Sequence, residues 1–337
     1  MPTSPETGST FSLAHKRIFV AGHRGMVGSA LVRRLESENC EVLTAPRREL
    51  DLTRQEAVER WMEAERPDAV FVAGAKVGGI AANEAYPADF LYQNLVIEAN
   101  LIDAAFRFGV RKLVFLASAC VYPQLAPQPL TEDSLLSGPL EPTNECCGMA
   151  KIAGIKLCHA YRRQHACDFV SAIPASLYGA GGNFDLHTGH ALPALIRKFH
   201  EAKLAGAKRV AIWGTGTPRR DFLHADDCAD ALVLIMKAYS DEEPINIGSG
   251  DDLPIIHLAM LVAHIIGFQG KIVNDAAKPD GMPGKLLSIE KLKALAWRPA
   301  IGLEEGIRAT YEWYRAKRED HSYRPAQPDT LSSAYSN

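Results

Sequence analysis

The sequence lacks a long apolar run and an excess of positive charge. No uninterrupted hydrophobic stretch is long enough to span a bilayer, and no signal peptide precedes the first predicted strand. Lysine and arginine total 37 against 40 acidic residues, so the net charge at neutral pH is −3. This balance leaves no basic footprint, and we therefore expect neither nucleic acid nor a membrane surface as a partner.

Cysteine also lacks a pattern. The seven cysteines are irregularly spaced and form neither a zinc-binding motif nor a disulfide framework. An odd number of cysteines without a signal peptide indicates reduced thiols, so we expect a cytoplasmic protein with no bound metal. With 337 residues, of which 47% are hydrophobic, the chain is long enough for one large or two modest globular domains.

What the sequence does contain is an alternation of strand-like and helix-like segments. Short apolar strands are predicted at 17–21, 42–45, 69–73, 112–117 and 169–174. Helices are predicted at 27–38, 55–65, 90–108 and 150–164, and a proline-rich surface loop at 123–142. This order predicts an α/β fold with a doubly wound parallel sheet. Beyond residue 174, shorter helices at 191–203, 226–238, 255–266 and 303–316 predict a smaller α/β domain.

A glycine-rich turn between the first strand and the first helix predicts a nucleotide site. Glycines permit a tight turn, and the helix N-terminus offers free N–H groups to a pyrophosphate. Three glycines alone would also suit any sharp turn, but the flanking strand and helix supply the context of a nucleotide site. The predicted cofactor-binding residues of this turn are Gly22, His23, Arg24, Gly25, Met26, Val27 and Gly28.

The end of the second predicted strand indicates which dinucleotide binds. An NAD site places an acidic side chain there to hold the ribose 2′-hydroxyl. In this chain Arg47 and Arg48 stand at that point instead. A guanidinium matches the geometry of a phosphate, although a solvated basic turn would have the same composition. Together with the glycine turn, the arginines predict NADP rather than NAD.

Two further segments carry reactive side chains. Ser118 and Cys120 follow the fourth predicted strand, while Cys147 and Lys151 adjoin the next predicted helix. With the glycine turn, Ser118 and Lys151 resemble an extended short-chain dehydrogenase/reductase. Members of one group, the GDP-L-fucose synthases, are NADPH-dependent epimerase/reductases acting on GDP-4-keto-6-deoxy-mannose. The chain resembles that family over residues 16 to 317. The segments that carry this resemblance are 75–80, 141–145, 150–158, 183–184 and 213–220.

The resemblance implies that Cys120 and His190 exchange protons at the carbons beside a C4 ketone and so invert C3 and C5. Such protons are removable because the enolate spreads its charge onto oxygen. Thiolate and imidazole both titrate near neutral pH, so each can act as acid or base. Ser118 would hydrogen-bond the ketone oxygen, or it would bind backbone as a strand-end hydroxyl. Taken alone, Cys120 would more often be a core thiol and His190 a capping or loop histidine.

The chain departs from the family pattern at Cys147. The family has a tyrosine four residues before the lysine that holds the nicotinamide ribose, and Lys151 is present while Cys147 replaces the tyrosine. A thiol ends nearer the backbone than a phenol, and a thiolate would repel the developing alkoxide. Three explanations compete: a reductase working through Ser118, water and Lys151, an epimerase without reduction, or a sequence error. The neighbouring Cys146 and Cys147 are interpreted as inert thiols rather than a redox switch.

The resemblance also implies further contacts with the cofactor and the substrate. Pro174, Leu177, Lys151 and His190 match cofactor-binding positions of the family. Lys198 stands where some relatives have arginine, which retains the charge but loses the planar fork of donors. Taken singly, such basic residues are more often solvated surface charges. The positions expected to bind the GDP-sugar are Lys198, Trp213, Arg220, Asp280 and Lys285.

The resemblance implies NADPH-dependent conversion of GDP-4-keto-6-deoxy-D-mannose to GDP-L-fucose, by C3/C5 epimerisation and C4 reduction. Because of Cys147, a 3,5-epimerase alone and a reductase of another GDP-4-keto sugar remain alternatives. A non-catalytic NADP-binding regulator would predict that Cys120 and His190 are lost as well, and both are present.

The expected organisation has four parts and a dimer. The amphipathic pattern at 89–108 suggests a helix–helix homodimer, although a helix facing the core would look the same. The expected parts are a flexible tail at 1–14, an NADP-binding domain at 15–176 with contributions from about 209–247, a mainly substrate-binding domain at 177–318, and a flexible tail at 319–337.

Overall fold

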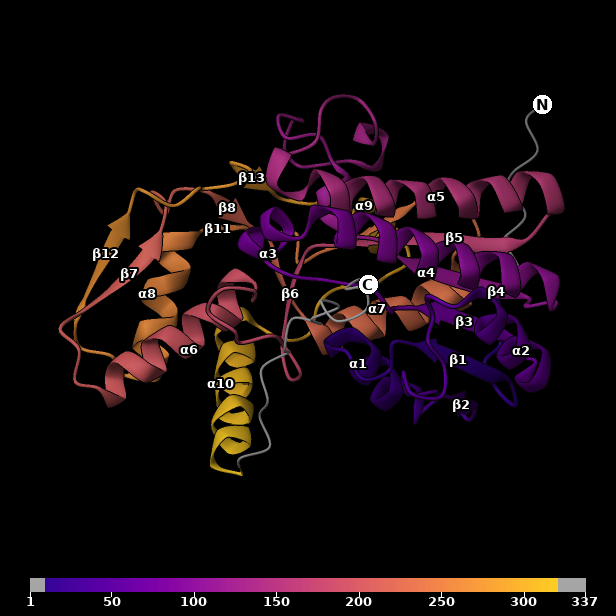
Figure 1. Cartoon of the computed structure of the whole chain (residues 1–337), viewed down its shortest axis with the longest axis horizontal. Helices are drawn as coiled ribbons and strands as arrows, with labels where there is room; N and C mark the ends of the chain where they lie inside the picture. Colours follow the sequence, from indigo (N-terminus) through magenta and orange to yellow (C-terminus); the bar gives the residue numbers. More distant parts are fainter. Residues whose placement is uncertain (1–9, 321–337) are drawn as a thin grey trace, which may run out of the picture.

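A six-stranded parallel sheet forms the centre of the fold, within residues 10–320 that the computed structural model describes (Figure 1). Its strands lie in the order β10-β5-β4-β3-β1-β2. Every residue of β3 is buried, because both faces of the sheet are covered. The strands are β1 (Arg17–Ala21), β2 (Glu41–Leu43), β3 (Ala69–Val72), β4 (Lys112–Leu116), β5 (Asp168–Pro174) and β10 (Ile245–Ile247).

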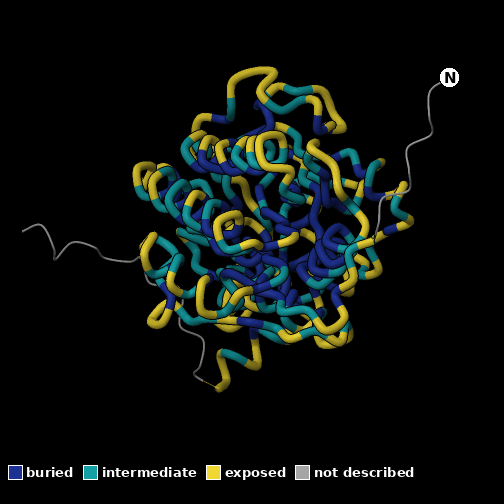
Figure 2. Tube along the Cα trace, turned by 90° about the vertical axis from the view of Figure 1, so that its right-hand side faces the viewer, coloured by how far each residue is buried: buried dark blue, intermediate teal, exposed yellow. Residues whose placement is uncertain are grey.

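Helices cover both faces of this sheet. Successive strand residues point to opposite faces, so Ile18 and Val20 pack in one core while Phe19 and Ala21 pack in the other. The buried positions accordingly gather at the centre of the molecule (Figure 2). The predicted doubly wound α/β fold is confirmed. The helices on one face are α1 (Met26–Leu35) and α7 (Ala225–Ala238), and those on the other are α2 (Gln55–Glu65), α4 (Pro87–Arg107) and α5 (Glu145–His165).

The strand order reverses at β1, which pairs with β2 on one side and β3 on the other. In such sheets, ligands bind in the crevice outside the carboxyl ends of the strands at this point. The backbones are in close contact there, since a Cβ added to Gly22 would lie 2.5 Å from the Cα of Gly74. Gly22 also has a φ of +86°, which side chains disfavour. Only glycine fits this turn.

The remaining elements form smaller sheets and a separate core beside the central sheet (Figure 1). Phe184, Phe199 and Tyr314 are among the fully buried side chains of that core. The strands are β6 (Ser176–Tyr178), β7 (Arg209–Trp213), β8 (Arg219–Arg220), β9 (Phe222–His224), β11 (Leu253–Pro254), β12 (Lys271–Asp275) and β13 (Gly284–Lys285). The helices are α6 (Ala191–Leu204), α8 (Ile255–Ile266) and α10 (Leu303–Glu319). Short helices elsewhere are α3 (Ile80–Ala85), α9 (Glu290–Ala294) and the 3₁₀ turns η1 (Ala119–Val121), η2 (Glu132–Ser134) and η3 (Pro142–Asn144).

Two segments differ from the expectations drawn from the sequence. The helix predicted from residue 150 begins at Glu145, because the Glu141 carboxylate caps the turn η3 that leads into it. In the predicted N-terminal tail, Leu13 is 2% exposed and packs on the core, while Phe11 N–H donates to the Lys237 carbonyl. Ordered structure therefore begins before residue 15, and the rest of both predicted tails, 1–9 and 321–337, lies outside the described residues.

Between residues 10 and 320, no helix combines the length and the apolar character needed to cross a bilayer.

Candidate active site

The glycine turn forms a cradle at the start of α1. Gly25 is the N-cap of α1 and no side chain caps this end, so the first N–H groups of the helix are available to a ligand. A Cβ added to Gly28 would collide with the Gly22 carbonyl, which explains the third glycine. Met26 and Val27 pack partly on the core beneath the turn. Free N–H groups at a helix N-terminus fit a pyrophosphate.

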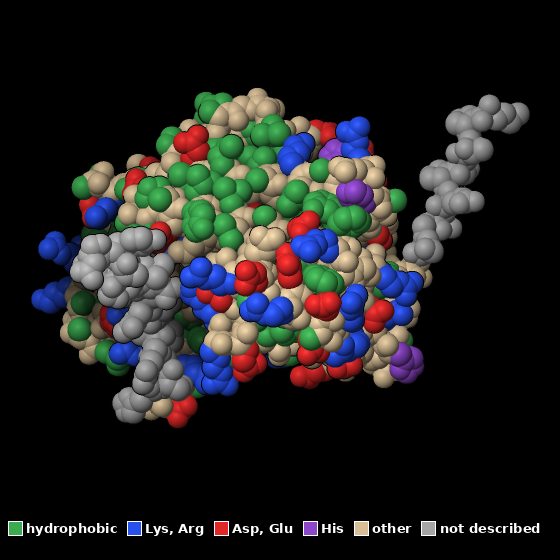
Figure 3. Space-filling view, turned by 45° about the vertical axis from the view of Figure 1, so that its right-hand side comes forward, with side chains coloured by type: hydrophobic (Ala, Val, Ile, Leu, Met, Phe, Trp, Pro, Cys, Tyr) green, Lys and Arg blue, Asp and Glu red, His purple; other side chains and the backbone are tan. Residues whose placement is uncertain are grey.

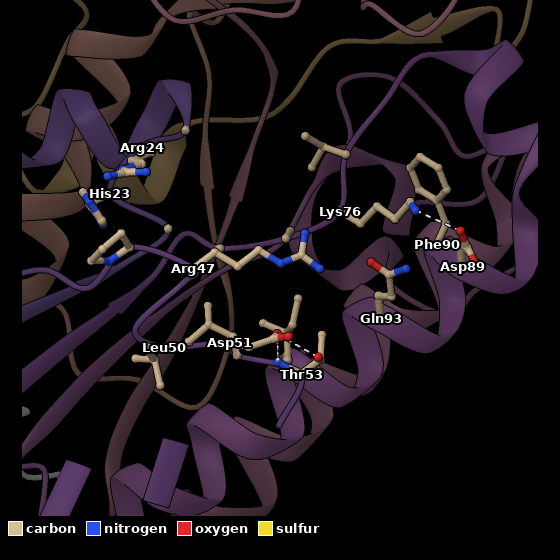
Figure 4. Close-up of a pocket in the computed structure, with 18 of the residues that line it drawn as sticks. His23, Arg24, Arg47, Leu50, Asp51, Thr53, Lys76, Asp89, Phe90 and Gln93 are labelled. Atoms are coloured by element: carbon tan, nitrogen blue, oxygen red, sulfur yellow. Dashed lines mark hydrogen bonds and ion pairs between the residues drawn. The ribbon is translucent and has the colours of Figure 1, made fainter. Parts of the chain in front are cut away.

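A cavity of about 430 Å³ opens beside this turn (Figure 4). Of the predicted cofactor residues it is lined by Gly22, His23, Arg24, Gly25 and Arg47, whereas Met26, Val27 and Gly28 are not part of its wall. Desolvation and the nearby Arg24 lower the pKa of the His23 imidazole. The neutral ring therefore adds little charge to the cradle.

Of the two arginines expected to bind a 2′-phosphate, only Arg47 faces the cavity. Arg47 follows β2 and its guanidinium points into the open space (Figure 4). The Arg48 side chain is 81% exposed and lies 3.5 Å from the Glu49 carboxylate. Arg48 is therefore not part of the cavity wall, and the prediction that a 2′-phosphate binds there concerns Arg47.

Several polar residues of the cavity wall were not predicted. Thr53 donates from its N–H and its hydroxyl to Asp51 Oδ1, at 3.0 and 2.7 Å. Lys76 Nζ lies 2.9 Å from Asp89 Oδ2 across the cavity (Figure 4). Lys76 belongs to segment 75–80, which the family resemblance includes, so that motif could have indicated it. The other three residues show no motif in the sequence.

A loop between β6 and α6 closes the cavity from the opposite side. Asn183 and Thr188 line the cavity, and the Thr188 carbonyl accepts from Gly79 N–H at 2.8 Å. The Asp185 carboxylate stabilises this loop by accepting from Thr188 N–H at 2.8 Å. The loop ends at His190, the N-cap of α6, which is exposed.

The remaining predicted cofactor residues lie at the same edge of the sheet but outside the cavity wall. Pro174 ends β5, and Leu177 is in β6 and packs partly on the core. Neither lines the cavity. Desolvation and the nearby Lys285 lower the pKa of the His190 imidazole.

Two cysteines meet behind the strand-end serine. Ser118 caps η1, and its hydroxyl accepts from Cys120 N–H at 3.5 Å. Cys147, in the first turn of α5, packs with Ala82 and Phe90 against Cys120. The neighbouring Cys147 thiol lowers the pKa of Cys120 to about 6; burial opposes this shift and the Lys285 charge adds to it. The same contact and burial raise the pKa of Cys147, so Cys120 is the thiolate of the pair.

Lys151 lies one turn further along α5 and is buried. Its ammonium lies 2.7 Å from the Glu98 carboxylate on α4 and donates to the Leu116 carbonyl at 3.1 Å. Burial raises the pKa of Glu98, and the Lys151 charge opposes that shift. Glu98 was not predicted, because a single acidic residue within a helix gives no functional signal in the sequence.

Two cations of the smaller sheets reach the same region. Lys285 in β13 is the register partner of Arg220 in β8. Desolvation and the Arg220 charge lower the pKa of Lys285, and burial lowers the pKa of Arg220 to about 10. Lys285 also influences both Cys120 and His190, so it lies close to both. Neighbouring cations with little solvent around them form a site for an anion such as a diphosphate.

The other predicted substrate residues make contacts within the protein. The Asp280 carboxylate accepts from Thr215 N–H at 2.7 Å and from its hydroxyl at 2.8 Å. Trp213 stacks under the Lys278 ammonium at 5.3 Å from the ring centroid. Lys198 Nζ donates to the Ala211 carbonyl in the same strand as Trp213, at 2.8 Å. Asp280 also influences Arg220, which connects this group to the paired cations.

Comparison with known proteins assigns the family. Residues 18–248 match the NAD dependent epimerase/dehydratase family. A GDP-L-fucose synthase of Sinorhizobium fredii is 56% identical over 311 residues, which cover 92% of this chain and 99% of that protein. The chain belongs to the GDP-L-fucose synthase family.

Solved structures support this membership of the GDP-L-fucose synthase family. A GDP-L-fucose synthetase from Naegleria fowleri, bound to NADP, superimposes with a TM-score of 0.85 at 27% identity and covers 94% of this chain and 99% of that one. A GDP-6-OMe-4-keto-L-xylo-heptose reductase from Campylobacter jejuni also gives 0.85, at 36% identity, covering 92% and 100%. The first of these structures holds NADP, the cofactor predicted for this chain.

The contact between Cys120 and Cys147 predicts how the alkylation rate of Cys120 depends on pH. Because the thiolate is the reactive form, alkylation of Cys120 by iodoacetamide should have its midpoint near pH 6. Cys147→Ala removes the donor to the thiolate and should raise that midpoint by about one pH unit, the equivalent of one ordinary hydrogen bond. Mass spectrometry of the alkylated peptide measures the rate at each pH. Cys146→Ala is the matched control, and an unchanged midpoint in Cys147→Ala would contradict the assignment.

Proposed function

We propose that this chain converts GDP-4-keto-6-deoxy-D-mannose to GDP-L-fucose with NADPH, by epimerisation at C3 and C5 and reduction at C4. The observation that carries the proposal is that Cys120 lies beside the strand-end Ser118 at the carboxyl end of β4 and packs against Cys147. The Lys285 charge, which lowers the pKa values of both Cys120 and His190, supports it. The NADP-type cradle and cavity at the same edge of the sheet support it. The names of the relatives, which describe reactions on GDP-sugars, also support the proposal.

In the proposed epimerisation, the Cys120 thiolate removes the proton beside the ketone. The electron pair moves onto O4, where the Ser118 hydroxyl donates a hydrogen bond to the enolate. His190 returns a proton to the carbon from the other face and recovers one from solvent, to which it is exposed. Cys120 then releases the proton it removed to solvent and is a thiolate again, so the cycle can run once at C3 and once at C5.

Bound NADPH would supply the hydride for the proposed reduction at C4. Ser118 would donate a hydrogen bond to the negative charge that develops on O4, and the positive charge of Lys151 at the carboxyl end of β4 would stabilise it without direct contact. The raised pKa of Cys147 keeps it a thiol, so it adds no second negative charge beside that oxygen. Cys147 is therefore compatible with reduction, although its proton is shared with Cys120.

The proposal includes a homodimer in the cytoplasm. Hydrophobic side chains gather on the upper part of the face in Figure 3, where α4 and α5 lie, and Tyr92 of α4 and Met149 of α5 are exposed. An exposed apolar helix pair of this kind suits a second copy of the chain. Cytoplasmic location is supported by the cysteines, all seven of which are free thiols. We further propose the division into an NADP-binding domain at 15–176 and a substrate domain at 177–318.

The direct test incubates the purified protein with GDP-4-keto-6-deoxy-mannose in D₂O, with and without NADPH. We expect deuterium at C3 and C5 in both samples and NADPH oxidation only in the sample that contains it. Cys120→Ser and His190→Asn should each depress deuterium uptake by about 10²–10⁴-fold, the usual contribution of a general acid or base. Undiminished uptake in either variant would exclude that residue, and uptake without NADPH oxidation would establish an epimerase alone.

Cofactor preference should depend on Arg47. Arg47→Ala removes the guanidinium that faces the cavity and should weaken NADPH by about 1.5–3 kcal/mol, the scale of hydrogen bonds to charged groups. NADH, which lacks the 2′-phosphate, should bind nearly as before. Fluorescence titration measures both affinities, and Arg48→Ala is the matched control because that side chain is exposed. Equal losses for both cofactors in Arg47→Ala would disprove the phosphate assignment.

The last functional prediction concerns the position of the missing phenol. Cys147→Tyr places a phenol beside Lys151 and should raise NADPH-dependent reduction, because a general acid contributes about 10²–10⁴-fold. The gain should largely disappear with Lys151→Met in the same chain, since the phenol loses its cationic neighbour. Single-turnover NADPH oxidation gives the rate, and cofactor affinity is measured separately. Slower reduction in Cys147→Tyr than in the native chain would show that the cysteine belongs to a rebuilt proton path.

A further inference from the structure

Glu98 forms the most enclosed ion pair of the candidate site. Its side chain is 2% exposed, its Oε1 atom lies 2.7 Å from Lys151 Nζ, and the lysine side chain is 3% exposed. Neither the glycine turn nor the proton-transfer residues account for this carboxylate. Burying a charge is strongly unfavourable unless an opposite charge compensates it, so each member of the pair depends on the other.

The contacts of Lys151 define how its ammonium is oriented. An ammonium has three N–H donors. One of them donates to the Leu116 carbonyl at 3.1 Å, and the Glu98 carboxylate lies beside the same nitrogen at 2.7 Å. The Phe115 ring lies 4.8 Å from this nitrogen. Because Leu116 ends β4, these contacts hold the ammonium at the carboxyl edge of the sheet.

Close packing of α5 brings Lys151 and Glu98 together. A Cβ added to Gly154, on the same helix, would lie 2.7 Å from Glu98 Oε2 and would collide with the Phe115 ring. The glycine therefore lets α5 approach both β4 and α4 closely. The lysine, the glutamate and the strand end are fixed as one packed unit.

We propose that Glu98 is a positioning residue that keeps the Lys151 ammonium charged and in place at the carboxyl end of β4, where it would contact the nicotinamide ribose of the bound cofactor. The inference rests on the NADP-dependent function proposed above. An opposite charge in contact favours the charged form of a buried group, and a buried carboxylate in contact restricts where the ammonium can lie. Glu98 itself acts only through Lys151.

Cofactor binding tests this role without relying on catalysis. Glu98→Gln keeps the size and removes the charge, and should weaken NADPH and NADH alike by roughly tenfold, equivalent to one charge-assisted hydrogen bond. The ratio of the two affinities should stay unchanged, because the ribose is common to both cofactors. Glu98→Asp retains the carboxylate and should restore most of the affinity. Glu132→Gln is the matched control, since that buried carboxylate binds Asn246 N–H instead.

A double-mutant cycle with Lys151→Met separates positioning from general packing. If Glu98 acts through Lys151, Glu98→Gln should cause no further loss of NADPH affinity in the Lys151→Met chain. Titrations run below the melting temperature of each variant, so that folded protein is measured. Equal losses in both backgrounds, or native affinity in Glu98→Gln, would overturn the inference while leaving the proposed function intact. Failure of the native chain to bind either cofactor would overturn both.

Discussion

The contact between the glycine backbones of β1 and β3 is the constraint on which the candidate site depends. Because Gly22 and Gly74 have no side chains, the two strand ends meet closely and α1 starts directly above the reversal of strand order. The free N–H groups of α1 then face the same crevice as Arg47. A side chain at Gly22 would separate the strands and close that crevice. The position of the cofactor cavity therefore follows from backbone packing before any functional side chain is considered.

Elements with a strong local signal were predicted well, whereas helix ends and side-chain partners that depend on distant contacts were not. The helices α2 and α8 have the predicted bounds because their apolar periodicity is uninterrupted between clear breaks. The start of α5 depends instead on the Glu141 cap, which a weak local pattern does not reveal. Arg47 and Arg48 are equivalent in the sequence. In the structure Arg47 lines the cavity and Arg48 is exposed. This difference depends on how the loop after β2 packs, which a local sequence pattern does not show.

Pairings between distant segments set the electrostatics of the site and had no sequence signal. Lys285 was expected to bind a diphosphate, yet its strand pairing with Arg220 also brings its charge to Cys120 and His190. Asp280 was expected at the substrate, and its carboxylate is engaged with Thr215. The family resemblance could indicate candidate site residues, because it matches positions of this sequence to functional positions of the family. It could not indicate that one cation serves two tasks, because that depends on the packing of strands remote in sequence.

If Lys285 binds the diphosphate as proposed, substrate binding would change the basicity of the Cys120 thiolate. In the free protein, the Lys285 charge and the Cys147 thiol hold the pKa of Cys120 near 6, where a thiolate is stable but only weakly basic. A diphosphate bound between Lys285 and Arg220 would neutralise part of that charge. The thiolate would then become more basic once substrate is in place, closer to the range in which proton abstraction at neutral pH is most effective.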